Sequence, residues 1–139
     1  MMINSKVAVI VVNWKKYDIT SSCIESILNS TNSNFKIILV DNESDNKKVK
    51  NFKYRNKIKI IQNKKNEGFS KANNIGIDYA LKNNFDYTIL INNDTIVEKN
   101  LIEVLLKTAQ AKNFSVVQPL ILKHNGKEIW NAGGRINYF

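Results

Sequence analysis

The sequence predicts an α/β domain with a doubly wound, mostly parallel β-sheet and helices on both of its faces. Short β-rich runs alternate along the 139 residues with longer stretches whose apolar residues recur at helical spacing. Alternating strands and helices of this kind build parallel sheets. The first run, Val7–Val12, is apolar throughout, which is typical of a strand buried on both faces. The length fits one domain, residues 1–139, with no internal repeat or interdomain linker.

The first half of the chain then predicts one helix and two further strands. Apolar residues at helical spacing indicate a helix over Tyr17–Ser30, with Asp18 as the expected N-cap. Lys36–Val40 is the next predicted strand. Ile58–Ile61 is another, after a polar, lysine-rich connection.

The next three elements continue the alternation of strand and helix. Three- and four-residue spacings of apolar residues predict a helix over Phe69–Leu81. A strand over Tyr87–Ile91 follows, and then a helix over Leu101–Ala111. These elements extend the parallel sheet and supply its covering helices.

The C-terminal part predicts a strand and a hairpin. Ser115–Leu122 has the composition of a strand, which Pro119 interrupts. Asn125-Gly126 is a strong signal for a tight turn, which we expect to close a hairpin before Glu128–Trp130. His124 beside this turn is interpreted as a solvated turn residue, because no second histidine or cysteine cluster supports a transition-metal site.

The net charge of +9 raises the question of a nucleic-acid partner. Only Arg55 and Arg135 are arginines among the 21 basic residues, and the lysines are scattered among asparagines and isoleucines. The densest cluster, Lys47 to Lys65, contains Phe52 and Tyr54 but no RNA- or DNA-binding signature. We therefore expect no nucleic-acid partner, whereas peripheral association with anionic lipid stays open.

The sequence also predicts a compartment. The single cysteine, Cys23, lies among Ile19, Ile24, Ile27 and Leu28 in a stretch with helical spacing, so we interpret it as a core residue compatible with a reducing cytoplasm. The apolar run Val7–Val12 is too short for a signal peptide, and no run approaches transmembrane length. We expect a cytoplasmic protein, with a location at the inner face of the cell membrane also open.

Polar segments follow four of the predicted strands. They are Asn13-Trp14, Asp41–Ser44, Asn66–Ser70 and Asn92–Thr95. In an open parallel sheet the ligand binds beyond the carboxyl ends of the strands, so these four segments together predict a cleft. The glycine fingerprint of dinucleotide-binding proteins and the Walker phosphate loop are both absent from the sequence, which leaves ordinary NAD and ATP sites without support.

Each of these residues also has a purely structural interpretation. Taken singly, Asp41 and Asp94 are more often turn residues or helix caps than ligands. Gly68 could simply end a loop, and Trp14 could be a packing residue. The four segments must therefore be judged together.

Four longer stretches of the sequence must be considered together: AVIVVNWKKYDITSSCIESIL, KIILVDNESDN, NEGFSKANNIGIDYALKNNFDYTILINNDTIV and IWNAGG. In their order, and at about their spacing, they resemble family-2 glycosyltransferases, most of all the bacterial rhamnosyltransferase-like branch. The resemblance covers nearly the whole chain. It implies a GT-A fold and a nucleotide-diphosphate sugar as donor.

The resemblance also implies which residues bind that donor. Asn13 and Trp14 match the loop that helps hold the base and ribose, and Asp41 matches an aspartate that contacts the base or ribose. The segment that lines the nucleotide pocket is matched by Asn66, Gly68 and Asn73, with Lys71 nearby.

Asn92, Asn93 and Asp94 match the family's Asp-x-Asp position, in its Asn-x-Asp form. Asp94 is accordingly the expected metal ligand, and the expected cofactor is Mg²⁺ or Mn²⁺. These cations take oxygen ligands, and one carboxylate suffices when the donor's phosphates supply others. Asn92 and Asn93 can position ribose or phosphate without adding negative charge.

The sequence departs from the family's pattern in two places. Lys15 and Lys16 stand where the family often has an asparagine-glycine pair. The acceptor-binding half follows the Gly-Gly segment in the family, so the chain resembles a donor-binding part truncated at its C-terminus. The catalytic general base is expected beyond Phe139, because Glu128 precedes the Gly-Gly segment and does not match.

Three hypotheses of function follow. The first is an inverting glycosyltransferase of polysaccharide biosynthesis that passes a sugar to a glycan or lipid-linked acceptor, although these residues alone should transfer little. The second is a non-catalytic module that binds a sugar nucleotide. The third is a structural domain that keeps only the fold.

Overall fold

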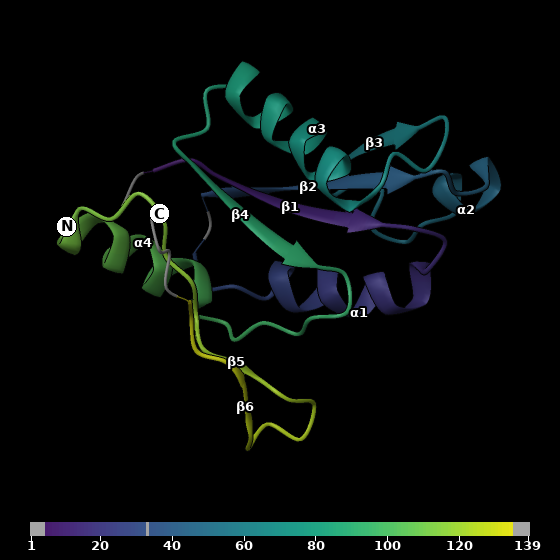
Figure 1. Ribbon diagram of the computed structural model, residues 1–139. Coiled ribbons are helices and arrows are strands. Elements are labelled where there is room, and N and C mark those ends of the chain that lie inside the picture. The colour runs from purple at the N-terminus through teal and green to yellow at the C-terminus, as the bar shows by residue number, and fades with distance from the viewer. Residues whose placement is uncertain (1–4, 33, 135–139) are drawn as a thin grey trace, which may run out of the picture.

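Four parallel strands form the central sheet of the computed structural model, which describes residues 5–32 and 34–134 (Figure 1). Across the sheet their order is β3, β2, β1, β4. The strands are β1 (Val7–Asn13), β2 (Phe35–Asn42), β3 (Lys59–Asn63) and β4 (Tyr87–Asn92). Every neighbouring pair runs parallel, so the carboxyl ends of all four strands lie at one edge.

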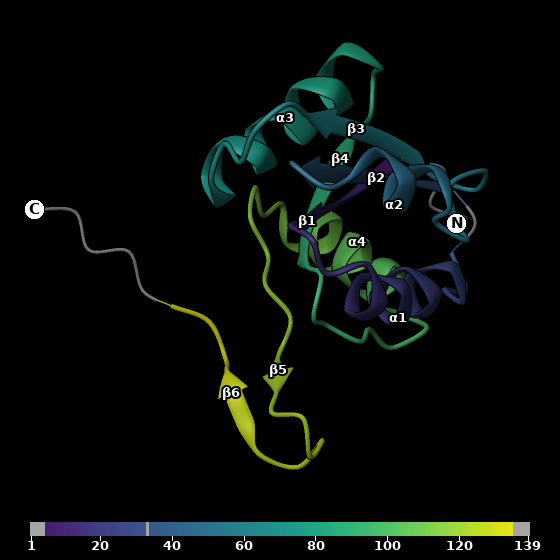
Figure 2. The ribbon, with the colours of Figure 1, turned by 90° about the vertical axis from the view of Figure 1, so that its right-hand side faces the viewer.

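Helices cover both faces of this sheet, as the sequence predicts. Helices α1 (Tyr17–Leu28) and α4 (Leu101–Lys112) lie on one face, and α3 (Phe69–Lys82) lies on the other (Figure 2). The short helix α2 (Asn46–Lys50) follows β2. The predicted fold class, a mostly parallel α/β sheet with helices on both faces, is confirmed.

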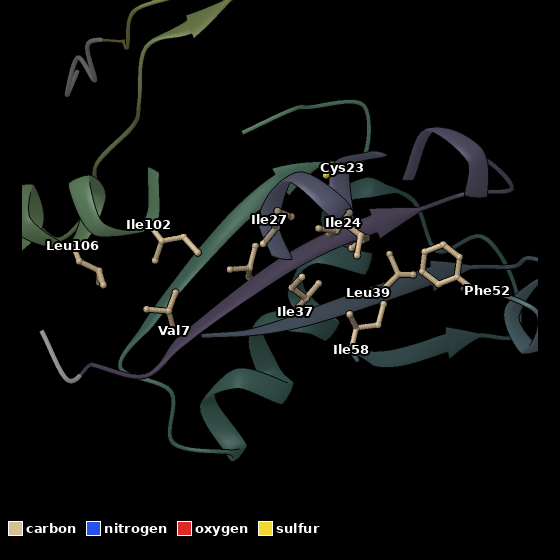
Figure 3. Packing of buried hydrophobic residues seen from close by; sticks show 12 residues of the cluster. Val7, Cys23, Ile24, Ile27, Ile37, Leu39, Phe52, Ile58, Ile102 and Leu106 are labelled. Carbon is tan, nitrogen blue, oxygen red and sulfur yellow. The ribbon is translucent and has the colours of Figure 1, made fainter. Parts of the chain in front are cut away.

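The central strand β1 joins two hydrophobic cores. Val7, Val9 and Val11 pack in the core that also contains residues of α1 and α4, where the labelled side chains of these elements point toward one another (Figure 3). Ile10 belongs to the opposite core, under α3. A Cβ added to Gly76 of α3 would lie 2.5 Å from Cγ2 of Ile10, so this close helix–sheet approach requires glycine. Burial on both faces explains why β1 is continuously apolar.

The first helix begins at Tyr17, as predicted, but its N-cap residue and its C-terminal end differ from the prediction. It begins at Tyr17 with Lys16 at the N-cap, so the prediction of Asp18 as N-cap is wrong. Asp18 lies within the first turn, where its negative charge favours the helix dipole. The helix ends at Leu28, and Asn29 caps it with a backbone N–H bonded to carbonyls of the last turn. Helix α2 was not predicted; Asp45 caps it by accepting from the Lys47 N–H at 2.7 Å.

The C-terminal part forms a hairpin that lies apart from the sheet (Figures 1 and 2). Only β5 (Ile121–Leu122) of the predicted strand Ser115–Leu122 forms, and it pairs antiparallel with β6 (Ile129–Asn131). The prediction of a strand over the whole of Ser115–Leu122 is wrong, because residues 115–120 pair with no other strand. Pro119 also lacks the backbone N–H that hydrogen bonding between strands needs. The turn at Asn125-Gly126 is confirmed, with Gly126 at φ +66°.

The described residues bear out two smaller expectations. Cys23 is fully buried in the core, as predicted. Burial, and to a smaller extent the nearby Asp94 carboxylate, raise the pKa of its thiol to about 12, so it is protonated at neutral pH. His124 is an exposed residue of the hairpin turn. Among the helices within residues 5–32 and 34–134, none is long and apolar enough to cross a membrane.

Candidate functional site

The strand register brings the four polar segments to one edge of the sheet. Asn13 is the register partner of Asp41, and Asn92 is the partner of Val12. On the other side of β2, Asn42 pairs with Asn63. A pocket of about 460 Å³ opens at this edge. It is lined by Val12, Trp14, Lys16, Asn42, Asn66, Gly68, Phe69, Asn92, Asn93 and Asp94.

Six of the ten residues predicted for the site line this pocket, and four do not. The six come from the ends of β1 and β4 and from the loop before α3: Trp14, Asn66, Gly68, Asn92, Asn93 and Asp94. Asn13 and Asp41 are fully buried at the same edge. Lys71 and Asn73 lie on α3 outside the lining.

Two exposed aromatic side chains stand at the pocket. Trp14 is 51% exposed and Phe69 is 62% exposed, although both are large and apolar. The packing interpretation of Trp14 therefore does not hold in this structure. An exposed aromatic face beside polar groups can stack on a planar ligand ring. Phe69 was not predicted as a site residue. Its position directly after Gly68, which was predicted, could have indicated it.

The loop before α3 is held by Asn42, a residue that the sequence analysis did not assign. Its Nδ2 donates to Oδ1 of Asn66 at 2.6 Å, and its Oδ1 accepts from the Glu67 N–H at 2.9 Å. Oδ1 of Asn66 also accepts from the Gly68 N–H at 2.9 Å. Gly68 has φ +79°, a conformation that favours glycine. These bonds fix the loop against the end of β2.

Asp41 is fully buried, and both of its carboxylate oxygens accept hydrogen bonds. Its Oδ1 accepts from Nδ2 of Asn13 at 2.8 Å and from Oγ of Ser44 at 2.6 Å. Its Oδ2 accepts from the Ser44 N–H at 3.0 Å. Burial, together with the nearby Asp41 charge, raises the pKa of Tyr17 well above its usual value. Asp41 thus holds the loop after β2.

The turn after β1 forms although lysines replace the family's asparagine-glycine pair. Lys15 adopts φ +59°, and Glu43 in the facing loop adopts φ +71°, both in the left-handed region. Such a conformation costs roughly 1 kcal/mol for a residue with a side chain. The Lys15 N–H donates to Oγ of Ser44 at 3.2 Å, which ties the two loops together. Strained backbone of this kind is common at functional sites.

The two predicted residues on α3 make contacts of their own. Lys71 pairs with Glu67 at 2.6 Å, and this pairing lowers the pKa of Glu67. Asn73 is buried and donates from Nδ2 to the carbonyl of Phe69 at 3.1 Å. Contact of either residue with a ligand stays a prediction.

Asp94 is the one carboxylate among the described residues that line the pocket, and it is exposed there. The described chain contains no cluster of three or more histidine, cysteine or acidic side chains that could hold a metal ion by itself. A magnesium-type cation does not need such a cluster when a diphosphate supplies oxygens. The single exposed carboxylate therefore fits a cation shared with a phosphorylated ligand, and does not fit a permanent protein-only metal centre.

Comparison with known proteins relates the whole fold to one family. The sequence profile described as Glycosyl transferase family 2 matches residues 8–137. An uncharacterized glycosyltransferase of Rickettsia bellii is 34% identical over 113 residues, which are 80% of this chain and 16% of that protein. Glycosyltransferase GlyG of Streptococcus pneumoniae is 31% identical over 115 residues, 80% of this chain and 36% of that protein.

A solved structure shares the fold of this chain. The crystal structure of S. aureus TarS in complex with UDP-GlcNAc matches with a TM-score of 0.68 at 20% identity, over 78% of this chain and 32% of that chain. This likeness shows the fold, which is the GT-A type that the sequence analysis expects. The chain spans 16% to 38% of the length of five curated relatives that it matches.

Proposed function

Because this chain belongs to glycosyl transferase family 2, we propose that its pocket binds the nucleotide-diphosphate sugar donor of a sugar transfer. The observation that carries this proposal is the pocket itself. An exposed aromatic ring, an amide-rich loop and a single exposed carboxylate meet at the carboxyl edge of the sheet. Such an edge is where open α/β sheets bind ligands.

The pocket offers each part of such a donor a suitable group. Trp14 supplies an aromatic face for the base, and Asn66 in the loop before α3 supplies a side-chain amide for the ribose. Lys16 brings a positive charge to the same pocket. Asp94 would hold Mg²⁺ or Mn²⁺, which supplies positive charge to the departing nucleotide diphosphate.

We also propose the complete transfer reaction, by comparison with the relatives, which are longer than this chain. An acceptor hydroxyl, on a glycan or a lipid-linked sugar, attacks the anomeric carbon of the donor, the bond to the diphosphate breaks, and the configuration inverts. A general base takes the hydroxyl proton. We place that base beyond Phe139, outside the described residues. The rhamnosyltransferase-like branch likewise stays a prediction.

Calorimetric titration with UDP-GlcNAc, UDP and UMP, each with and without Mn²⁺, tests donor binding. TarS was crystallised with UDP-GlcNAc, which makes a uridine nucleotide the first choice, and GDP serves as the second nucleotide. We expect weak binding of a diphosphate that Mn²⁺ strengthens about tenfold, whereas UMP should gain less because it lacks the second phosphate. Absence of a metal effect for both UDP and GDP would contradict the proposal.

The excess of positive charge falls in one segment of the sequence. Ten of the 21 basic residues and one acidic residue lie between Lys47 and Lys71, so this segment accounts for the whole net charge of +9. We name it the basic segment; it runs from α2 through β3 to the first turn of α3. Within the described chain, eight of these ten cations form no ion pair: Lys47, Lys48, Lys50, Arg55, Lys57, Lys59, Lys64 and Lys65.

We propose that the basic segment associates with anionic lipid at the cytoplasmic face of the membrane. Each lysine near such a surface contributes about 1 kcal/mol. Exchanging Lys47, Lys48 and Lys50 for glutamate should abolish sedimentation with phosphatidylglycerol vesicles. The charge-matched control, Lys82, Lys99 and Lys112 exchanged for glutamate, should still sediment. Equal binding to phosphatidylcholine vesicles, or tighter binding to RNA than to vesicles, would contradict this partner.

A further inference from the structure

A chain of hydrogen bonds connects the loop after β4 to the ends of β1 and β2. Nδ2 of Asn93 donates to Oγ1 of Thr20 at 2.9 Å. Thr20 in turn lies 2.9 Å from Oδ1 of Asn13, to which its hydroxyl donates. Nδ2 of Asn13 then donates to Oδ1 of Asp41 at 2.8 Å. Three loops of the pocket edge are thus joined through one residue of α1.

Thr20 occupies the junction because of its place in the helix. It lies one turn into α1 and is fully buried, on the side that faces the sheet edge. The carbonyl of Lys16 lies 2.8 Å from the same hydroxyl, so the single hydroxyl proton is shared between Asn13 and this carbonyl, a partner that threonine often has within a helix. That local bond does not require burial against Asn13 and Asn93. The contact with Asn93, 73 residues away, is therefore the specific feature of this position.

The other end of the chain of bonds is firmly anchored. Asp41 is fully buried. Its Oδ1 accepts from Asn13 and from the Ser44 hydroxyl, and its Oδ2 accepts from the Ser44 N–H. A buried carboxylate that accepts several hydrogen bonds is costly to move, because each lost bond exposes a group to an apolar environment. The ends of β1 and β2 thus form the fixed side, against which Thr20 holds Asn93.

We propose that Thr20 is a positioning residue that fixes the Asn93–Asp94 turn at the pocket. Asn93 and Asp94 both line the pocket, but Asp94 itself is exposed, so its position depends on the residue before it. Fixing Asn93 orders the turn in advance, and a pre-ordered turn lowers the entropy cost of holding a cation and a diphosphate. This inference rests on the proposed donor site. It also assigns Asp41 to the support of the pocket, in place of direct contact with the nucleoside.

Three variants of α1 test the role of Thr20. Thr20→Val keeps the shape of the side chain and removes both the acceptor of Asn93 and the donor to Asn13. Thr20→Ser keeps the hydroxyl. Ser21→Ala is the matched control, because the Ser21 hydroxyl makes the same kind of bond within the helix, to the carbonyl of Tyr17 at 2.8 Å.

Titration with UDP, with and without Mn²⁺, should separate these variants. We expect Thr20→Val to lose most of the roughly tenfold affinity gain from Mn²⁺, while its affinity without metal changes less than about twofold. Thr20→Ser and Ser21→Ala should keep the gain. If Thr20 only stabilised the fold, Thr20→Val would lower the affinity for UDP equally with and without Mn²⁺. A Thr20→Val protein with an intact Mn²⁺ gain would overturn the proposal.

Amide hydrogen exchange tests the same inference without any nucleotide. The Thr95 N–H donates to the carbonyl of Asn92 at 3.1 Å and closes the turn that carries Asp94. We expect this amide, and the Asn93 side-chain amide, to exchange several-fold faster in Thr20→Val than in Ser21→Ala. Unchanged exchange at both groups would overturn the positioning role. If no protein binds UDP or GDP, the donor site is wrong, and exchange alone decides the role of Thr20.

Discussion

Exchanging Asp94 for asparagine is expected to remove most of the affinity that Mn²⁺ or Mg²⁺ adds to nucleoside-diphosphate binding. The substitution keeps the size and the neighbours of the side chain and removes its charge. Without that charge the protein contributes only a weak ligand, and the diphosphate alone holds the cation. We expect the roughly tenfold gain from Mn²⁺ to fall to less than about twofold, measured by titration with UDP.

The same titration also separates a metal ligand from a simple turn residue. Without metal, Asp94→Asn should bind UDP as well as the unchanged protein or slightly better, because the carboxylate and the phosphates repel each other when no cation lies between them. Asp78→Asn is the charge-matched control, since Asp78 is an exposed residue of α3 that does not line the pocket. A normal Mn²⁺ effect in Asp94→Asn would leave Asp94 as only a turn residue.

The fold was predictable because its strands are of two clearly different kinds. β1 is apolar at every core position and is buried on both faces, and this is the pattern of a central parallel strand. β4 alternates between half-buried and exposed residues, because Tyr87, Ile89 and Ile91 pack against the core under α1 and α4, whereas Leu90 on the opposite face is 52% exposed. The failed prediction concerns residues 115–120, where strand propensity finds no partner strand.

The site was predictable only as far as it lies at strand ends. Trp14 and Asp94 each follow an apolar run, so the strand pattern alone brings them to one edge. Thr20 could not be recognised in the same way. It is one of several small polar residues of α1, and only the packing of that helix shows that Thr20 faces Asn13 while Ser21 bonds within the helix. Contacts between distant elements leave no local pattern.

Asn42 and Asp41 show a second limit of sequence reasoning. They are adjacent at the end of β2, yet Asn42 lines the pocket and Asp41 does not. Successive residues of a strand point to opposite faces, so the register decides which one meets a ligand. The resemblance points to Asp41 as a ligand residue and does not point to Asn42. In the structure Asn42 holds the Asn66–Gly68 loop, and Asp41 holds the loop after β2.

Exchanging Asp41 for asparagine should lower both the stability of the fold and the affinity for UDP, with or without metal. The Asp41 carboxylate accepts from Asn13 and twice from Ser44, and all three residues are buried. Asparagine offers one oxygen and one amide group, so its amide would face either the Ser44 N–H or the Asn13 amide, donor against donor. Leaving a buried donor without an acceptor costs about 1–3 kcal/mol, and we expect a loss in that range in urea denaturation.

Asp45→Asn is the matched control for this prediction, because it makes the same chemical change in the same loop. Asp45 is exposed and caps α2 through the Lys47 N–H, and asparagine caps a helix about as well as aspartate. Its unfolding midpoint should therefore stay unchanged, while that of Asp41→Asn falls. Below its unfolding transition, Asp41→Asn should bind UDP more weakly by a similar factor with and without Mn²⁺, in contrast to Asp94→Asn. A stable Asp41→Asn protein would mean that the carboxylate is not needed to hold the loop, and a selective loss of the Mn²⁺ effect would mean that Asp41 acts on the cation.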